Sequence, residues 1–426
     1  MSARPTVAVV GSGISGLTAA RALDDECDVT VFESGDYVGG HTRTLDVEIA
    51  GSAVSVDIGF IVFNDWTYPN FIAFLNELGV DSVPTSMGFS LSDERSGLEY
   101  RGGSWGGLFA QRRNALKPCY YRFLLEIKRF FDEGKQALES GDLSETFGEY
   151  IETRGYSKAC VEQFILPMAG AIWSTEPARV REFPASFFLR FFANHGLLNL
   201  TDRPVWRTVR GGSRTYIDKL LPSLRGKVLV NRPVTAIRRH EHGVTLHIEP
   251  LGSREFDYVI LACHSDQALA LLNDASDREK AALAAIRYQD NEVVLHTDRS
   301  LLPKRRRAWA AWNYHLQATE RDVATLTYSM NILQHLDTPK PVCVTLNASD
   351  RIAPSSVLHR QIMAHPLYTT SALAGQSALR DLSGQRRTAF AGAYLGNGFH
   401  EDGVVSGLAA ASRIREAVAV GSPVGV

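Results

Sequence analysis

The sequence predicts an α/β fold in which a discontinuous Rossmann-type domain is combined with a mixed α+β, largely helical domain. Three observations lead to this prediction. The first 33 residues contain a strand, a glycine-rich turn, a helix and a second strand, a mostly helical block follows, and strand patterns return from residue 227. The length of 426 residues also exceeds what one hydrophobic core normally fills, so two domains are expected.

The N-terminal strand is a continuous apolar run, residues 7–10, which is typical of a buried parallel strand. The motif Gly11-x-Gly13-x-x-Gly16 follows it and opens a helical pattern. The first glycine permits a tight turn, the second lets the backbone approach a pyrophosphate, and the third lets helix and strand pack closely. Glu33 ends the second strand, about 20 residues downstream, where an acid binds ribose hydroxyls. Together these features indicate a dinucleotide site.

The residues after the second strand distinguish between dinucleotides. An acid at position 33 would repel the extra phosphate of NADP, which leaves NAD or FAD. The segment 39–44, Gly-Gly-His-Thr-Arg-Thr, stands where an NAD domain would usually begin a helix. On its own it could be a hairpin turn, but its glycine pair allows another close backbone approach, and His41 and Arg43 offer hydrogen-bond donors. Combined with the later strands and a C-terminal strand–glycine–helix element, it favours FAD.

The rest of the chain supplies the other elements. Apolar periodicity, with prolines at helix starts and glycines at helix ends, predicts helices over residues 69–78, 118–138, 143–153, 157–169 and 184–198. Short strands are predicted at 228–230, 234–237, 244–248, 258–261 and 388–393, before a final helix over 404–418. We therefore expect an FAD-binding domain made of 1–66, 205–266 and 385–426, and a substrate or cap domain made of 67–204 and 267–384.

Composition excludes several classes of protein. The net charge of −2 and the pI near 6.6 give no global attraction to nucleic acid or anionic lipid. The basic run at 304–307, beside Trp309 and Trp312, could contact phosphates but is expected to be a solvated loop. The five cysteines form no C-x-x-C pair, which favours a reducing compartment over disulfides or a zinc site. With neither a signal peptide nor a membrane span in the sequence, we expect a cytoplasmic protein with at most peripheral membrane contact.

The C-terminal motif covers residues 390–407, and it predicts a second helix N-terminus near Gly403 and Val404. In a flavin site such a terminus can stabilise the negative charge that reduction places around N1 and the C2 carbonyl. No cysteine stands in this motif, so covalent flavin attachment is not expected.

With these motifs in place, the chain resembles the flavin-containing amine oxidase superfamily. It is most similar to a branch of bacterial predicted NAD/FAD-binding proteins that resemble the N-terminal flavin domain of plant cyclopropane fatty-acid synthases. The segments that carry the resemblance span nearly the whole chain, at 9–17, 39–42, 57–64, 67–70, 108–114, 166–168, 172–174, 194–198 and 398–403.

The resemblance implies FAD as the cofactor, and the sequence contains no cluster of metal-ligating residues, so no metal is expected. The residues that it implies for FAD are Gly11, Gly13, Ser15, Gly16, Glu33, Gly40, His41, Arg43, Gly59, Val234, Asp402, Gly403 and Val404. One departure concerns Gly392-Ala393, which stands where many relatives carry Gly-Glu, so the ribityl contact must come from elsewhere.

Candidates for catalysis come from the same resemblance. Phe399 falls where amine oxidases place an aromatic residue beside the flavin, and His400 and Glu401 are candidate proton-transfer groups. The structural alternative is that His400 and Glu401 cap the last helix or bond the backbone. Further residues predicted to line the substrate pocket, or else to be core residues, are Leu395, Tyr68, Trp173 and His195.

Three functions agree with the sequence: a desaturase-like oxidoreductase of an extended apolar or acyl-lipid substrate, an oxidase of a small amine, and a non-catalytic flavin-binding partner of a lipid-modifying methyltransferase. The stretch 183–192 is apolar on almost every face, so it must be buried against protein, a ligand or a membrane surface. In the branch that the chain resembles, aromatic residues are usual at the positions of Leu395, Asn397 and Ser329. Their loss predicts an opened tunnel past Phe399, and favours the acyl substrate.

Overall fold

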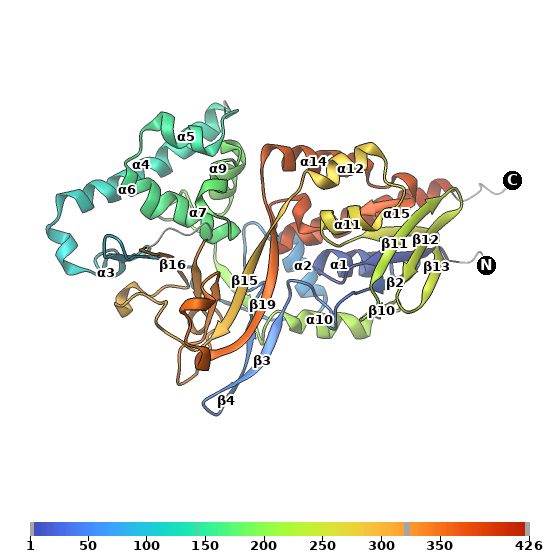
Figure 1. Cartoon of the computed structure of the whole chain (residues 1–426), viewed down its shortest axis with the longest axis horizontal. Helices are drawn as coiled ribbons and strands as arrows, with labels where there is room; N and C mark the ends of the chain where they lie inside the picture. Colours follow the sequence, from blue (N-terminus) through green and yellow to red (C-terminus); the bar gives the residue numbers. More distant parts are fainter. Residues whose placement is uncertain (1–3, 142, 319–323, 422–426) are drawn as a thin grey trace.

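The computed structural model describes residues 4–141, 143–318 and 324–421 and confirms the predicted α/β fold class. Figure 1 shows an elongated molecule. The parallel sheet lies toward one end, and the helices of residues 105–194 gather at the other end.

A five-stranded parallel sheet has the order β10 (Lys227–Leu229), β2 (Asp28–Phe32), β1 (Thr6–Val10), β14 (Tyr258–Leu261) and β20 (Thr388–Phe390). Successive side chains of β1 point to opposite faces of this sheet. Val7 and Val9 pack with α1 (Ile14–Leu23) and α15 (His400–Gly421). Ala8 and Val10 pack on the other face. Because both faces are covered, the strand is apolar at every position rather than alternating.

The face of the sheet that carries Ala8 and Val10 is covered by a three-stranded antiparallel sheet and three helices. These elements are β11 (Val234–His240), β12 (Gly243–Ile248), β13 (Gly252–Phe256), α11 (Ser265–Leu271), α12 (Asp277–Ala284) and α14 (Thr370–Leu382).

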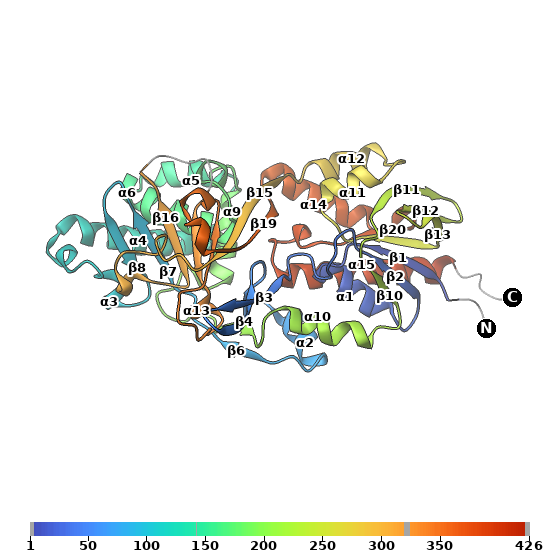
Figure 2. The same cartoon turned by 60° about the horizontal axis from the view of Figure 1, so that its bottom comes forward.

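A seven-stranded sheet forms the second part of the molecule. Its order is β19 (Val357–Pro366), β15 (Tyr288–His296), β18 (Cys343–Leu346), β17 (Leu326–Ser329), β16 (Trp312–Leu316), β7 (Phe89–Asp93) and β8 (Leu98–Arg101). The long strands β15 and β19 pair antiparallel from Tyr288 opposite Pro366 onward. Both views place these two strands between the parallel sheet and the helical end (Figures 1 and 2).

The helical end has a core of stacked aromatic rings. The ring centroids of Phe147 and Phe188 lie 3.6 Å apart, and those of Phe188 and Phe192 lie 4.3 Å apart. The apolar stretch 183–192 is therefore buried largely against protein. No helix in the described ranges is long and apolar enough to cross a membrane. The helices of this end are α3 (Trp105–Leu108), α4 (Pro118–Ser140), α5 (Phe147–Arg154), α6 (Lys158–Cys160), α7 (Leu166–Trp173), α8 (Pro177–Val180) and α9 (Ala185–Asn194).

The helix predicted over 157–169 is interrupted in the structure. A π-helical turn, Val161–Ile165, separates α6 from α7. Pro167 has no N–H group to donate to the regular ladder, so the change in hydrogen bonding next to it has a local cause.

The elements that connect the two parts are β3 (Thr44–Ile49), β4 (Ser52–Asp57), β5 (Val62–Asn64), α2 (Pro69–Glu77), β6 (Ser82–Pro84), β9 (Trp206–Val209), α10 (Arg214–Leu220) and α13 (Met330–Leu333).

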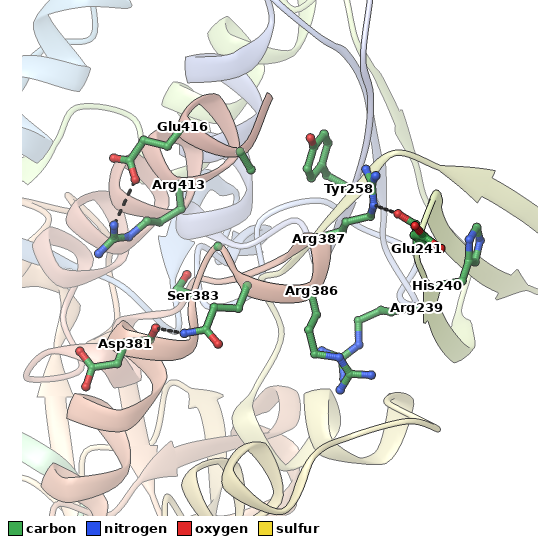
Figure 3. Close-up of a pocket in the computed structure, with 13 residues that line it drawn as sticks. Arg239, His240, Glu241, Tyr258, Asp381, Ser383, Arg386, Arg387, Arg413 and Glu416 are labelled. Carbon is green, nitrogen blue, oxygen red and sulfur yellow. Dashed lines mark hydrogen bonds and ion pairs between the residues drawn. The ribbon is translucent and has the colours of Figure 1, made fainter. Parts of the chain in front are cut away.

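An ion-pair cluster around buried Arg239 and Glu279 joins β11 to the α11–α12 segment and to the turn before β20. Arg239 pairs with Asp274 and with Glu279, and Arg386 pairs with the same two acids. The cluster borders a hollow of about 890 Å³ at the amino ends of β14 and β20. Figure 3 shows Arg239 and Arg386 side by side in this hollow. Both guanidinium groups are neutralised by protein carboxylates, so the cluster serves to hold segments together.

Glu279→Gln should lower the free energy of unfolding by about 3 kcal/mol at neutral pH, because it leaves buried Arg239 with only Asp274 as its ionised partner. Burial alone would raise the pKa of Glu279, but hydrogen bonds from Arg239 and Ser276 lower it to about 2. The contribution of Glu279 is therefore fully present above its ordinary pKa of 4.5 and disappears as the pH falls toward 2. Urea unfolding of wild type and variant along this pH range measures the difference.

The matched control is Glu416→Gln, which breaks the exposed pair with Arg413 and should cost less than about 1 kcal/mol. Equal losses for both variants, or a Glu279 effect that does not change between pH 4.5 and 2, would contradict the structural role of the cluster.

Candidate functional site

A cavity of about 640 Å³ opens at the carboxyl ends of the parallel strands. It is lined by Val10 and Phe32, at the ends of β1 and β2, and by Ala262 and Gly392, just beyond β14 and β20. Ligands of open α/β sheets bind at this edge. The larger hollow beside Arg239 lies at the opposite, amino edge, so the smaller cavity is the candidate site.

The glycine motif forms one wall of this cavity. Gly13 is the N-cap of α1, which has no side-chain cap, so its first N–H groups are available to an anion. A Cβ atom built on Gly13 would meet nothing within 4 Å, because the space in front of it is the cavity. A Cβ atom on Gly40 would lie 3.3 Å from the Cα of Gly13, so the two glycine segments face each other. This cradle fits a diphosphate.

Glu33 lies at the end of β2 and lines the cavity. Its carboxylate accepts hydrogen bonds from the Ser12 N–H at 3.0 Å, from the Ser12 hydroxyl at 2.6 Å and from the Gly35 N–H at 2.8 Å. These bonds fix the acid beside the glycine turn, where the ribose of a dinucleotide would lie.

The predicted FAD residues divide into two groups. Those that line the cavity are Gly11, Gly13, Ser15, Glu33, Gly40, His41, Gly59 and Val234. Those that do not are Gly16, Arg43, Asp402, Gly403 and Val404.

The second group has structural roles. A Cβ atom on Gly16 would collide with the carbonyl oxygen of Gly11, so this glycine serves close packing. The guanidinium of Arg43 lies 3.8 Å from the Tyr37 ring centroid. The final helix begins at His400, earlier than the predicted start near Gly403, and this places Gly403 and Val404 inside the helix. Asp402 accepts a hydrogen bond from the Phe399 N–H at 2.9 Å, and burial raises its pKa to about 6.

Aromatic residues form much of the remaining wall. Two of them, Tyr368 and Tyr394, have buried hydroxyl groups without a hydrogen-bond partner in the described part of the chain. Buried hydroxyls are normally paired, so these two donors indicate that a polar ligand group belongs beside them. The other aromatic residues of the wall are Phe32, Phe60, Trp173, Tyr288, Trp312, Tyr328 and Phe399.

Three histidines, His41, His264 and His365, meet in the cavity wall. The ring of His41 lies 5.5 Å from that of His365 and 6.0 Å from that of His264. Burial lowers the pKa of His41 to about 3, and repulsion from the two neighbouring rings acts in the same direction. Burial also lowers the pKa of His365 to about 4 and that of His264 below its ordinary value. The cluster is therefore neutral at physiological pH.

His264 and His365 were not among the predicted site residues. The sequence position of His264 could have indicated a site residue, because it follows the carboxyl end of the predicted strand 258–261. His365 carries none, since only the pairing of β19 with β15 brings it to the cavity.

His400 lines the cavity but is engaged with the protein. Its ring stacks on Phe60 at 3.4 Å, and its Nε2 lies 3.0 Å from the Thr42 hydroxyl and 3.1 Å from the Tyr216 hydroxyl. Burial, followed by the nearby His41 ring, holds the pKa of His400 well below its ordinary value. The ring is neutral at physiological pH and offers no imidazolium proton.

The expectation that Glu401 transfers protons is corrected by its contacts. Its carboxylate accepts from the backbone N–H and side-chain amide of Asn70 and from the N–H of Phe71, at the N-terminus of α2. Glu401 does not line the cavity. The negative charge opposite a helix N-terminus gives it a structural role instead.

Among the predicted pocket residues, Phe399 and Trp173 line the cavity, whereas Leu395, Tyr68 and His195 do not. Tyr68 is buried with Phe63 and Phe71. His195 stacks on Phe191 at 3.9 Å, and Phe399 stacks on the same ring at 5.0 Å, so His195 supports the wall from behind.

Two of the three residues at which the sequence predicts a missing aromatic side chain in the pocket, Leu395 and Ser329, do not line the cavity. Leu395 packs in the core beneath the cavity, and its neighbour Tyr394 lines the wall, so Leu395→Trp is not expected to narrow the cavity directly. Ser329 is buried elsewhere, while the adjacent Tyr328 lines the wall, because successive residues of β17 point to opposite faces. Asn397 does line the cavity.

Comparisons with known proteins give consistent matches. The family model described as flavin-containing amine oxidoreductase matches residues 14–415. A candidate flavin-containing monoamine oxidase, AofH, of Mycobacterium tuberculosis is 27% identical over 356 residues, covering 78% of this chain and 72% of the relative. The coproporphyrinogen III oxidase of Mycobacterium bovis is 25% identical over 316 residues, covering 67% and 65%.

Solved structures share the fold. Cyclohexylamine oxidase from Brevibacterium oxydans superposes with a TM-score of 0.70 at 18% identity, covering 98% of this chain and 100% of that structure. A fatty acid isomerase from P. acnes superposes with a TM-score of 0.67 at 16% identity, covering 97% and 99%. At these identities the likeness concerns the fold alone.

Gly13→Leu should weaken FAD binding by at least about 100-fold, or roughly 2.7 kcal/mol, because its side chain would enter the diphosphate cradle. The control is Gly106→Leu in exposed α3, where a Cβ atom also meets nothing within 4 Å. FAD titration of both apoproteins, with melting temperature as the check on folding, measures the effect. Unchanged FAD affinity in Gly13→Leu would show that the cradle is not the diphosphate site.

Proposed function

Because its family model matches residues 14–415, the chain belongs to the flavin-containing amine oxidoreductase family, and we propose that it oxidises a neutral, extended apolar substrate such as an acyl lipid. The proposed reaction is desaturase-like, with a non-covalently held FAD as hydride acceptor. The family itself leaves the substrate open, since its matched relatives are named for both amine and porphyrinogen oxidation.

The chemistry of the cavity wall carries the proposal. Among the described residues that line it, Glu33 carries the one carboxyl group, and there is no lysine or arginine. Glu33 lies at the ribose end and is already bonded to Ser12 and Gly35. An ammonium substrate would therefore find no carboxylate to compensate its loss of hydration. Aromatic and aliphatic walls instead suit a neutral apolar chain.

Oxidation of a small amine is the second candidate. It is supported by the amine oxidase name of the 27% identical relative, and by aromatic rings such as Trp173 and Phe399, which can hold a cation over their faces.

The chain's own residues would hold and shield the cofactor. The N-terminus of α1 would bind the diphosphate, Glu33 the ribose, and the hydroxyls of Tyr368 and Tyr394 the polar edge of the flavin or of the substrate. FAD supplies a two-electron acceptor for the hydride that the substrate loses. Phe60, Trp173 and Phe399 would exclude water from this end of the cavity.

Cysteine chemistry supports two further parts of the proposal. Of the described cysteines, Cys263 alone lines the cavity, and burial raises the pKa of its thiol to about 12, which disfavours the reactive thiolate. This supports non-covalent FAD. All five cysteines are free thiols, which supports a cytoplasmic location.

Anaerobic mixing with candidate substrates tests the proposal. Acyl lipids should bleach the visible absorbance of the bound flavin, whereas simple primary amines should not. Trp173→Leu should slow bleaching by lipid at least about tenfold without releasing FAD, since it changes the substrate wall. Trp66→Leu, outside the cavity, is the matched control.

Rapid bleaching by a primary amine with no response to lipid would replace the proposal with amine oxidation. Bleaching by a chemical reductant alone would favour the non-catalytic partner of a lipid-modifying enzyme.

A further inference from the structure

The end of the molecule opposite the parallel sheet carries an unusual exposed surface. We call it the distal tip and define it as residues 101–125 and 303–312. Figures 1 and 2 place α3, which belongs to it, at this end. Large apolar side chains stand in solvent here: Leu116 is 87% exposed, Trp105 76%, Leu125 67% and Tyr121 45%. Large exposed apolar side chains gathered in one region often mark an interaction site.

The distal tip is held in shape by its own contacts. Trp105 stacks on Phe109 with 6.1 Å between ring centroids, and Phe109 contacts the Tyr121 ring at 5.9 Å. The Tyr121 hydroxyl donates to the Ala115 carbonyl at 3.0 Å. Arg101 donates to the Trp309 carbonyl at 3.3 Å and thereby joins the two segments. The exposed side chains therefore project from an ordered surface.

The distal tip is also strongly cationic. Its two segments contain nine lysines and arginines and no aspartate or glutamate, although the whole chain has a net charge of −2. Only two of the exposed cations form an ion pair with a described residue: Arg122 pairs with Glu126, and Arg305 pairs with Glu99. The exposed cations are Arg112, Arg113, Lys117, Arg122, Lys304, Arg305, Arg306 and Arg307.

We propose that the distal tip docks onto the surface of an anionic lipid bilayer. Its leucine and aromatic side chains would enter the boundary between headgroups and acyl chains, and the surrounding cations would bind lipid phosphates. Tryptophan and tyrosine are the aromatic residues that favour this boundary. The sequence expectation of a solvated basic loop considered residues 304–307 with Trp309 and Trp312, and it did not include the exposed apolar side chains of α3 and α4.

Two other occupants fit the distal tip less well. A second copy of the chain docked tip to tip would bring two cationic surfaces together, which is unfavourable. Single-stranded nucleic acid would match the charge, but it is bound through bases stacked on aromatic rings. Two of the three most exposed apolar residues of the tip, Leu116 and Leu125, are aliphatic and cannot stack on bases. Aliphatic side chains fit the acyl chains of a bilayer better.

The distal tip connects directly to the cavity. The basic segment leads into β16, whose first residue, Trp312, lines the cavity wall. Trp312 packs edge-to-face against Tyr328, another residue of that wall, at 5.8 Å. Docking would thus bring this wall near a source of apolar substrate. The proposal of membrane docking does not depend on the proposed substrate, because vesicle binding tests the first and flavin bleaching tests the second.

Sedimentation of the FAD-loaded full chain with vesicles tests the proposal. Phosphatidylcholine vesicles that contain phosphatidylglycerol should bind the protein at least about tenfold more strongly than phosphatidylcholine alone, and added salt should weaken the binding. Leu116→Ser and Arg306→Glu should each reduce binding at least about fivefold. The matched controls are Leu200→Ser and Arg278→Glu, exposed residues outside the distal tip whose substitution should leave binding unchanged.

Cys119 provides an internal reporter, because it is exposed within the distal tip while the other cysteines are buried or half-buried. Anionic vesicles should slow its reaction with a water-soluble maleimide, and neutral vesicles should not. Equal binding to both vesicle types, loss of binding in the control variants, or continued rapid labelling of Cys119 on bound protein would overturn the proposal. So would binding of single-stranded DNA without vesicle binding, or a dimer that Leu116→Ser dissociates.

Discussion

The close packing of backbone around the first turn of α1 is the constraint on which the site depends. A Cβ atom on Gly16 would collide with the Gly11 carbonyl, and one on Gly407 would collide with the Ser15 carbonyl. The glycines thus let α1 approach the end of β1 on one side and α15 on the other. As a result α1 begins at the cavity with its capping residue Gly13, and α15 begins beside it with His400. The N-terminus of α1, which has no side-chain cap, provides the partial positive charge that an anionic cofactor needs, without lysine or arginine in the described wall. At the start of α15, by contrast, Asp402 already accepts from the Phe399 N–H.

The parts of the fold and site that were predictable from sequence are local. The strand, turn, helix and acid of the first 33 residues form one unit, so spacing alone placed Gly13 and Glu33 at the cavity. Long-range contacts decided the rest. Glu401 looks like a proton-transfer group beside His400, yet its carboxylate caps the N-terminus of α2 by binding Asn70, which lies 331 residues earlier along the chain. Within the C-terminal motif, a 3₁₀ turn (Ala393–Leu395) directs Tyr394 rather than Leu395 to the wall, and no periodicity in the sequence indicates this.

Burial gives the cavity a consistent electrostatic character. His41, His264, His365 and His400 all have pKa values below the ordinary value, with burial as the largest cause. A neutral wall around the aromatic residues fits a neutral substrate, whereas the charges of the molecule lie elsewhere. Arg239, Arg386 and their two acids hold the amino edge of the sheet together, and the cations of the distal tip face solvent. Cofactor binding, stabilisation of the sheet and electrostatic attraction to other surfaces are thus properties of different parts of the chain.

The identity of the bound dinucleotide tests the central claim most directly. The purified protein should be yellow, and heat denaturation should release intact FAD into the supernatant, identified by its chromatographic mobility and absorbance spectrum. Release of FAD rather than retention on the denatured chain would also establish that the cofactor is held without a covalent bond. A colourless protein that binds NAD in the cavity would contradict the account, because the second glycine segment, the acid at position 33 and the aromatic wall would then serve a different ligand.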